Sequence, residues 1–107
     1  MMDHDDLAPR AAEAAALLRQ LANERRLLLL CHLTVAGEAT VGQLADLVGL
    51  SQSALSQHLG RLREDGLVAT RRAGTTIHYR LADPRVARLI GALRDIFCPP
   101  PGRRPAA

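Results

Sequence analysis

Residues 41–68 read VGQLADLVGLSQSALSQHLGRLREDGLV, and this stretch decides the fold. Apolar residues recur at helical spacing on both sides of Gly49, which predicts a short helix over 41–48 and a longer one over 51–65. Gly49 suits the left-handed backbone that often ends a helix, so we expect the two helices to meet at a tight turn. A short helix, a glycine turn and a longer helix in this order predict a helix-turn-helix.

Both helices begin at a residue that can cap them, and both carry one apolar side. Thr40 and Ser51 are the expected N-caps, because a hydroxyl oxygen can accept hydrogen bonds from the free backbone N–H groups of a first turn. Gly66 is expected to close the longer helix as Gly49 closes the shorter one. The residues predicted to face the core are Leu44, Leu47, Val48, Leu55, Leu59 and Leu62.

Helical patterns also lie on both sides of this unit. An amphipathic helix is expected over 10–22, and Asn23 can cap a following helix over 25–35. The second of these segments is apolar nearly all round, so we expect it to be buried on most faces. A last helix is expected over 84–98, with Asp83 as its N-cap and a run of three prolines ending it.

The sequence period changes after Gly66. Residues 67–72 and 76–82 alternate and are rich in Val, Thr, Ile and Tyr, and residues 73–75 between them contain a glycine. This pattern predicts a β-hairpin. The predicted fold is therefore mainly α with a small β-hairpin, a winged helix-turn-helix with the element order α-α-α-α-β-β-α.

The chain of 107 residues has room for one small domain, which we place at 10–98. Residues 1–9 are expected to form a flexible N-terminal lead, and residues 99–107 a disordered Pro/Arg tail. No apolar run approaches the ~18 residues of a membrane span, and the acidic start is opposite to the basic start of a signal peptide. We therefore expect a cytoplasmic protein with no membrane contact.

The charge of the chain indicates an anionic partner. All 14 basic residues are arginine, the formal net charge is +3, and the isoelectric point is about 9.6. A basic balance in so small a domain is typical of proteins that bind nucleic acid, provided that the charge gathers on one face.

Polar and basic side chains on the longer helix and on the hairpin predict where DNA binds. Glutamine can bond adenine bidentately, serine can bond bases or phosphates, and arginine suits phosphate or guanine. A solvated helix face or a charge-protected edge strand would carry similar residues, but the Arg-rich hairpin beside the helix favours DNA. The predicted DNA-binding residues are Gln52, Ser53, Ser56, Gln57 and Arg61 on the helix and Arg71, Arg72, Thr75 and Thr76 on the hairpin.

The chain has two cysteines, Cys31 and Cys98, far apart in the sequence. In a cytoplasmic chain a structural disulfide is not expected, which leaves buried core thiols or a redox or metal-binding pair. Cys31 lies among leucines, where cysteine is commonly buried, whereas Cys98 stands at a helix end before three prolines. The residues alone leave these alternatives open.

Three stretches resemble a known family: LLRQLANERRLLLLCHL at 17–33, the stretch at 41–68, and TRRAGTTIHYRL at 70–81. Together they resemble the ArsR/SmtB-type dimeric repressors over residues 11–98. Glu24 departs from the pattern, because the family often has proline there. The resemblance implies a homodimer formed through the first and last helices. The two recognition helices of this dimer would lie ~34 Å apart and read an inverted repeat in double-stranded DNA.

The same resemblance bears on the signal. The arsenic and cadmium sensors of the family carry paired thiols in the helix before the recognition helix, and residues 38–44 contain no cysteine. The zinc and nickel sensors carry Asp and His ligands along the last helix, where residues 85–98 contain Asp95 but no histidine. Neither of these metal sites is present, so no metal and no other cofactor is expected.

The contexts RRLLLLCHL and LIGALRDIFCPP are similar to the sulfide- and redox-responsive branch of the family, the BigR/SqrR-like repressors. This resemblance implies that Cys31 and Cys98 are redox-sensing thiols, which persulfide, polysulfide or another oxidant joins so that the operator is released. Arg25 or Arg94 is expected to favour the thiolate form, which is the nucleophile.

Two alternatives stay open, and a third is not expected. A metal- or metalloid-responsive repressor could use the cysteines as ligands, and a winged-helix module could bind a protein instead of DNA. A thiol oxidoreductase is not expected, because the chain has no CxxC motif and no paired base. The chain is therefore predicted not to be an enzyme.

Overall fold

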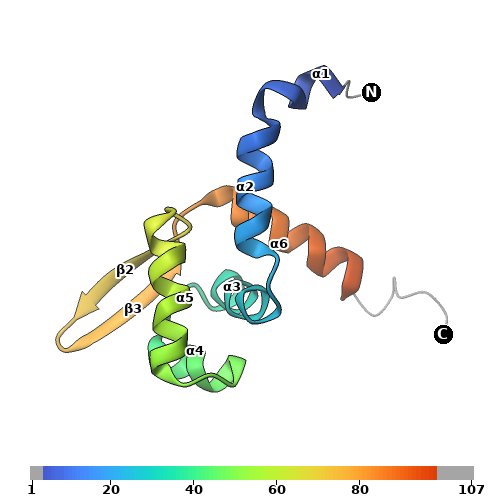
Figure 1. The fold of residues 1–107 in the computed structure, drawn as a ribbon. Coiled ribbons are helices and arrows are strands. Elements are labelled where there is room, and N and C mark those ends of the chain that lie inside the picture. Colours follow the sequence, from blue (N-terminus) through green and yellow to red (C-terminus); the bar gives the residue numbers. More distant parts are fainter. Residues whose placement is uncertain (1–3, 99–107) are drawn as a thin grey trace.

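The computed structural model describes residues 4–98 (Figure 1). Helices dominate, and the predicted order of elements is confirmed with additions at the N-terminal end and before the helix-turn-helix. The elements are α1 His4–Leu7, the 3-10 helix η1 Ala8–Arg10, α2 Ala11–Leu21, α3 Glu24–Ala36, β1 Ala39–Thr40, α4 Val41–Val48, α5 Gln52–Glu64, β2 Val68–Ala73, β3 Thr76–Leu81 and α6 Pro84–Phe97.

The three strands form one antiparallel sheet in the order β1-β3-β2. In the hairpin Val68 pairs with Leu81 and Ala73 with Thr76, so the turn consists of Gly74 and Thr75. The sequence predicts the hairpin but not β1, because two residues are too short to show an alternating pattern. The mainly helical winged-helix fold is otherwise as predicted.

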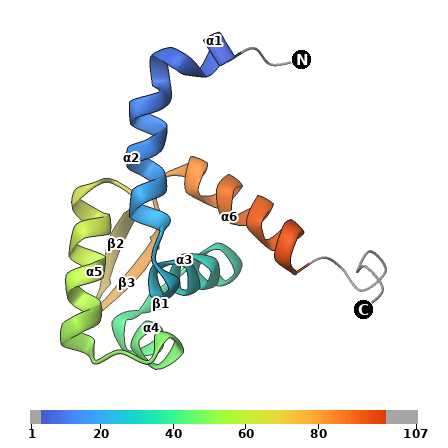
Figure 2. The same cartoon turned by 45° about the vertical axis from the view of Figure 1, so that its right-hand side comes forward.

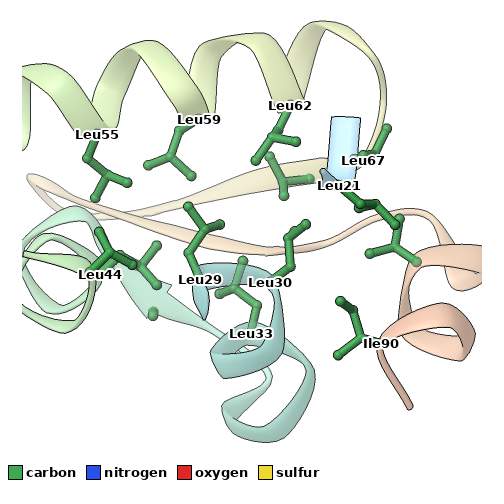
Figure 3. Close-up of a cluster of buried hydrophobic side chains, with 14 of the residues drawn as sticks. Leu21, Leu29, Leu30, Leu33, Leu44, Leu55, Leu59, Leu62, Leu67 and Ile90 are labelled. Atoms are coloured by element: carbon green, nitrogen blue, oxygen red, sulfur yellow. The ribbon is translucent and has the colours of Figure 1, made fainter. Parts of the chain in front are cut away.

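The core lies between α5, α3 and the hairpin, as Figure 3 shows. Three leucines of α5 and three of α3 point toward one another, and all six are at most 1% exposed. The prediction that one stripe of α5 faces inward is thereby confirmed. These leucines are Leu55, Leu59 and Leu62 on α5 and Leu29, Leu30 and Leu33 on α3.

The predicted caps are present. Asn23 accepts from two backbone N–H groups at the start of α3, and Thr40 forms a reciprocal capping box with Gln43 at the start of α4. The side chains of Ser51 and Asp83 likewise accept backbone hydrogen bonds at the starts of α5 and α6. Each cap satisfies N–H groups that a helix cannot pair internally, so these residues fix where the helices begin.

Two predictions of burial are wrong. Leu47, expected in the core, is 46% exposed, and Ala45 is buried on α4 in its place. On α3, Leu28 and Val35 are exposed, so this helix is not buried on most faces. α3 is therefore buried along the side that carries Leu29, Leu30 and Leu33, and Leu28 and Val35 remain exposed among the described residues.

The expected flexible lead is helical where the structure describes it. Residues 4–10 form α1 and η1, and η1 accommodates Pro9 in its first turn, where no intrahelical N–H bond is required of it. Residues 1–3 and the predicted tail 99–107 lie outside the described residues.

Figures 1 and 2 show how the elements spread from the core. The β2–β3 hairpin projects from one side, and α6 leads away on the opposite side. α2 rises from the α3 end of the core and carries α1 at its far end. The helix-turn-helix of α4 and α5 and the hairpin therefore form one end of the molecule, and α2 and α6 form another.

Candidate nucleic-acid interface and thiol groove

α5 presents a continuous polar side to solvent. Its buried leucines fix its rotation against the core, so residues on the opposite side point outward. All five residues predicted to touch DNA from this helix are exposed: Gln52, Ser53, Ser56, Gln57 and Arg61.

Two glycines shape this polar side. A Cβ on Gly42 of α4 would lie 3.7 Å from Nε2 of Gln52, so the Gln52 amide rests over α4. Gly60 lies one turn after Ser56 on α5, and a Cβ there would meet nothing within 4 Å. At Gly60 the exposed side of α5 carries no side chain, so a DNA strand could approach the backbone closely there.

An arginine from α3 holds the turn between α4 and α5. Nη1 of Arg25 donates hydrogen bonds to the backbone oxygens of Val48, at 2.8 Å, and Gly49, at 2.9 Å. These carbonyls end α4, where a helix leaves carbonyls unpaired and its dipole favours a cation. The guanidinium of Arg25 is therefore engaged at the turn, so of the two arginines expected to favour the thiolate only Arg94 lines the groove with the cysteines.

The next arginine holds α5 itself. Nε of Arg26 donates to Nδ1 of His58 at 3.0 Å, and its Nη1 donates to the Gln20 side-chain oxygen at 2.9 Å. One guanidinium thus joins α2, α3 and α5. Partial burial, together with the positive charges of Arg26 and Arg25, lowers the pKa of His58. The imidazole is consequently neutral and accepts on Nδ1, with its proton on Nε2.

The hairpin places its predicted contacts in solvent. The register pairs Arg71 with His78 and Arg72 with Ile77, so the two arginines point to opposite faces of the ribbon. All four residues predicted to touch DNA from the hairpin are exposed: Arg71, Arg72, Thr75 and Thr76.

The two hairpin arginines differ in their partners. Arg71 donates two hydrogen bonds to the Glu38 carboxylate, at 2.8 and 3.0 Å. Its side-chain hydrogen bonds hold the pKa of Glu38 below its ordinary value. Within residues 4–98, Arg72 makes no hydrogen bond and no ion pair. Arg72 is therefore available to a phosphate, whereas Arg71 must first leave Glu38.

The two cysteines line one open groove. Cys31 is half-buried on α3, Cys98 is exposed at the C-terminal end of α6, and both are free thiols. The groove between the two helices has a volume of about 610 Å³. Its walls are mostly apolar, and Arg94 lies among them. The structure thus places two residues that are distant in sequence on the walls of the same cavity.

A second hollow, of about 520 Å³, lies between α1 and α2 on one side and the start of α6 on the other. Leu7, Leu17 and Leu89 line it, together with charged side chains that include Arg88. Large apolar side chains also stand in solvent along α2 and α6, with Phe97 76% exposed. These helices therefore carry apolar surface that nothing in residues 4–98 covers.

Two further observations concern the described part of the chain. Within residues 4–98, no three His, Cys, Asp or Glu side chains gather in a way that could hold a metal ion. None of the helices in this range combines the length and the apolar character that crossing a bilayer requires.

Sequence reasoning missed the two side-chain pairs that hold the site together. Arg26 and His58 are 32 residues apart, and Glu38 and Arg71 are 33 residues apart. No local pattern connects partners at such distances, since they meet only when α3 packs under α5 and β1 joins the sheet. The only available signal was the helical spacing that places His58 between the core and the exposed side of α5.

Comparison with known proteins identifies relatives along nearly the whole chain. Residues 23–70 match the bacterial regulatory protein, arsR family. The chain is 47% identical over 97 residues to the biofilm growth-associated repressor of Xylella fastidiosa, covering 91% of this chain and 84% of that protein. It is 44% identical over 97 residues to the transcriptional activator HlyU of Vibrio cholerae, covering 91% and 89%.

Solved structures agree with these sequence matches. The crystal structure of the transcriptional repressor BigR from Xylella fastidiosa aligns with a TM-score of 0.83 at 47% identity, covering 91% of this chain and 98% of that chain. Reduced HlyU from Vibrio cholerae aligns with a TM-score of 0.80 at 45% identity, covering 87% and 97%. The winged-helix fold is confirmed, and these relatives are DNA-binding transcriptional regulators and not enzymes.

Proposed function

Because this chain belongs to the ArsR family of bacterial regulatory proteins, we propose that it is a homodimer that releases an inverted-repeat operator when Cys31 and Cys98 are oxidised. The chain is a DNA-binding transcriptional repressor of that family. The dimer, the operator contacts and the thiol chemistry are the proposed parts. The oxidant that we propose is a reactive sulfur species, a persulfide or a polysulfide.

The DNA contacts follow from the polar side of α5 and from the hairpin. An α-helix fits the major groove, where Gln57 and Ser56 can reach base edges, and Arg61 can reach a phosphate or a guanine. The hairpin extends away from α5, so Arg72 is well placed for a phosphate outside the bases that the helix reads. Helix and hairpin together would grip one half-site.

The homodimer is supported by the unpartnered apolar surface of α2 and α6. Leu18 on α2 and Ile96 on α6 are more than half exposed, and large exposed apolar surface commonly marks a site of protein association. A two-fold axis between these helices would bury the same surface on both protomers. It would also present two copies of α5 on the side away from the interface.

The thiol chemistry needs two thiols and one sulfane sulfur. One thiolate attacks a sulfane sulfur of a polysulfide, which forms a cysteine persulfide and releases a shorter polysulfide. The second thiolate attacks the inner sulfur of that persulfide, closes an S–S bond between the two cysteines and releases hydrosulfide. The two thiols lose two electrons and two protons, and the electrons pass to the sulfur that leaves as sulfide.

The observation that carries this proposal is the groove that Cys31 and Cys98 share. Two thiols from different helices thus lie where one oxidant molecule in the groove could reach both. Cys98 is exposed and Cys31 half-buried, so a dissolved oxidant can reach the groove. A direct bridge requires Cα atoms about 4.4–6.8 Å apart, and extra sulfur atoms in the bridge would span a longer gap.

The test measures mass and DNA affinity together. The reduced protein first selects an operator from random double-stranded DNA, and inorganic polysulfide is then added. We expect a loss of two hydrogens, or a gain of whole sulfur atoms, together with weaker operator binding. Cys98→Ser should bind the operator when reduced but should not respond to polysulfide, and Cys31→Ser should behave in the same way because the bridge needs both thiols.

Two results would contradict the proposal. If the protein is modified without a change in operator affinity, the thiols are not the switch. If Cys98→Ser still responds fully to polysulfide, the pair is not the sensor. In either case the inducer of this repressor has to be sought elsewhere, beginning with metal ions.

A further inference from the structure

We propose that Arg26, together with its neighbour Arg25, is the positioning residue that couples the thiol groove to the recognition helix α5. The inference deepens the proposed thiol switch and rests on it. It concerns how a change between α3 and α6 reaches a helix that carries neither cysteine.

The first turn of α3 lies between the thiol groove and the helix-turn-helix of α4 and α5. Asn23 lines the groove, and its side-chain oxygen accepts hydrogen bonds from the backbone N–H groups of Arg25, at 3.0 Å, and Arg26, at 3.1 Å. The same asparagine thus belongs to the groove wall and fixes the backbone from which both arginines extend. A displacement of this wall therefore displaces the bases of both arginine side chains.

The two arginines reach different parts of the helix-turn-helix. Arg25 holds the carbonyls of Val48 and Gly49 at the turn, and Arg26 holds His58 in the middle of α5. One attachment holds the turn that leads into α5 and the other holds α5 itself, so together they restrain the rotation of α5 about its own axis. The rotation of α5 matters because its exposed side chains contact base edges only when they point into the groove of the DNA.

Arg26 also contacts α2, one of the two helices at the proposed dimer interface. Its Nη1 donates to both the backbone and the side-chain oxygen of Gln20 on α2, at 3.4 and 2.9 Å. The lowered pKa of His58 keeps its imidazole neutral, so it remains an acceptor at neutral pH. α2, α3 and α5 therefore meet at one guanidinium, whose planar fork can serve two partners at once.

A bridge between Cys31 and Cys98 would act at this junction. It would fix α3 and the end of α6 in one geometry and reshape the groove between them. The leucines shared by α3 and α5 are a competing route, since they too connect the two helices. The two routes differ in one respect: removing the His58 acceptor leaves the leucine contacts intact.

The experiment compares operator affinity in the reduced and bridged states for a small set of variants. His58→Leu removes the acceptor, and His58→Asn keeps an acceptor near the position of Nδ1. Arg26→Lys keeps the positive charge but lacks the fork, and so stands in if His58→Leu fails to fold. Arg19→Met is the control, because it removes an exposed arginine of α2 that does not line the groove.

We expect all variants to bridge by intact mass and to bind the operator when reduced. The ratio of bridged to reduced dissociation constants should fall by about fivefold or more in His58→Leu and Arg26→Lys. It should stay at the wild-type value in His58→Asn and Arg19→Met. A wild-type ratio in both His58→Leu and Arg26→Lys would overturn the inference and leave the leucines as the route.

A second measurement separates this inference from the thiol switch itself. If the wild-type protein bridges and keeps its operator, the proposed function fails, and hydrogen exchange of the reduced protein then decides the coupling. Asn23→Ala should accelerate exchange of the α5 amides, whereas Asn23→Ser, which keeps a capping oxygen, should not. Equal exchange over α5 in the two variants would overturn the inference.

Discussion

The hairpin offers a quantitative test of DNA binding, because its two adjacent arginines have different partners. Arg72 has no partner within residues 4–98, whereas Arg71 is held by Glu38 at 2.8 Å. A side chain that contacts a phosphate displaces counterions and adds a fixed amount to the salt dependence of binding. We therefore expect Arg72→Ala to reduce that salt dependence and Glu38→Gln, which frees Arg71, to increase it.

The magnitude follows from the number of contacts. Each phosphate contact contributes about 0.9 to the slope of log K against log salt concentration, so two hairpins in a dimer contribute about 1.8. Over a roughly fourfold rise in salt, from about 50 to about 200 mM, this corresponds to about a tenfold change in affinity. Arg72→Ala should lose a salt-dependent factor of this size, equally for specific and random DNA.

The assay is fluorescence anisotropy of the reduced protein on labelled operator at five or more salt concentrations. Arg19→Met serves as the control for loss of a positive charge away from the hairpin. An unchanged slope in Arg72→Ala would remove the hairpin from the DNA interface. A slope that is unchanged in Glu38→Gln, with a reduced slope in Arg72→Ala, would show that Arg71 faces away from the phosphates.

Three further predictions concern α5. Gly60→Ala should raise the free energy of unfolding by about 0.5–1 kcal/mol in urea denaturation, because the added Cβ meets nothing within 4 Å. The same methyl group should weaken operator binding if DNA approaches this backbone. Unchanged operator affinity would place the DNA elsewhere. Leu59→Ala should cost about 2–5 kcal/mol, since this side chain is fully buried, and a loss below about 1 kcal/mol would contradict the packing. Because the pKa of His58 lies below its ordinary 6.5, the unfolded chain binds the proton more readily than the folded chain. The free energy of unfolding should therefore fall as the pH drops below about 6.5, and this loss should be absent in His58→Asn. Identical pH profiles of the two proteins would refute this prediction.

Local patterns in the sequence were sufficient for most of the fold. The caps at Asn23 and Thr40 and the glycine at Gly49 act within three or four residues, so their positions in the sequence determine where helices begin and end. The exposed residues of α5 followed in the same way from the spacing of its leucines. What could not be predicted depends on partners distant in the sequence.

Leu47 illustrates the limit for burial, and Arg25 illustrates it for the site. Both Leu47 and Ala45 fit the inner side of α4 by spacing, and the packing of α3 and α5 decides that Ala45 is covered. Arg25 or Arg94 was expected to favour the thiolate, but the guanidinium of Arg25 instead donates to two carbonyls at the end of α4. Tertiary packing decides both cases.

The short strand β1 connects the hairpin to the helix-turn-helix. Thr40 pairs with His78 of the hairpin and at the same time caps α4, so the hairpin and the helix-turn-helix share one piece of backbone. The distance from the hairpin tip to α5 is therefore fixed by the fold. In the proposed complex with DNA, the offset between the bases read by α5 and the phosphate contacted by the hairpin should therefore be the same in every half-site.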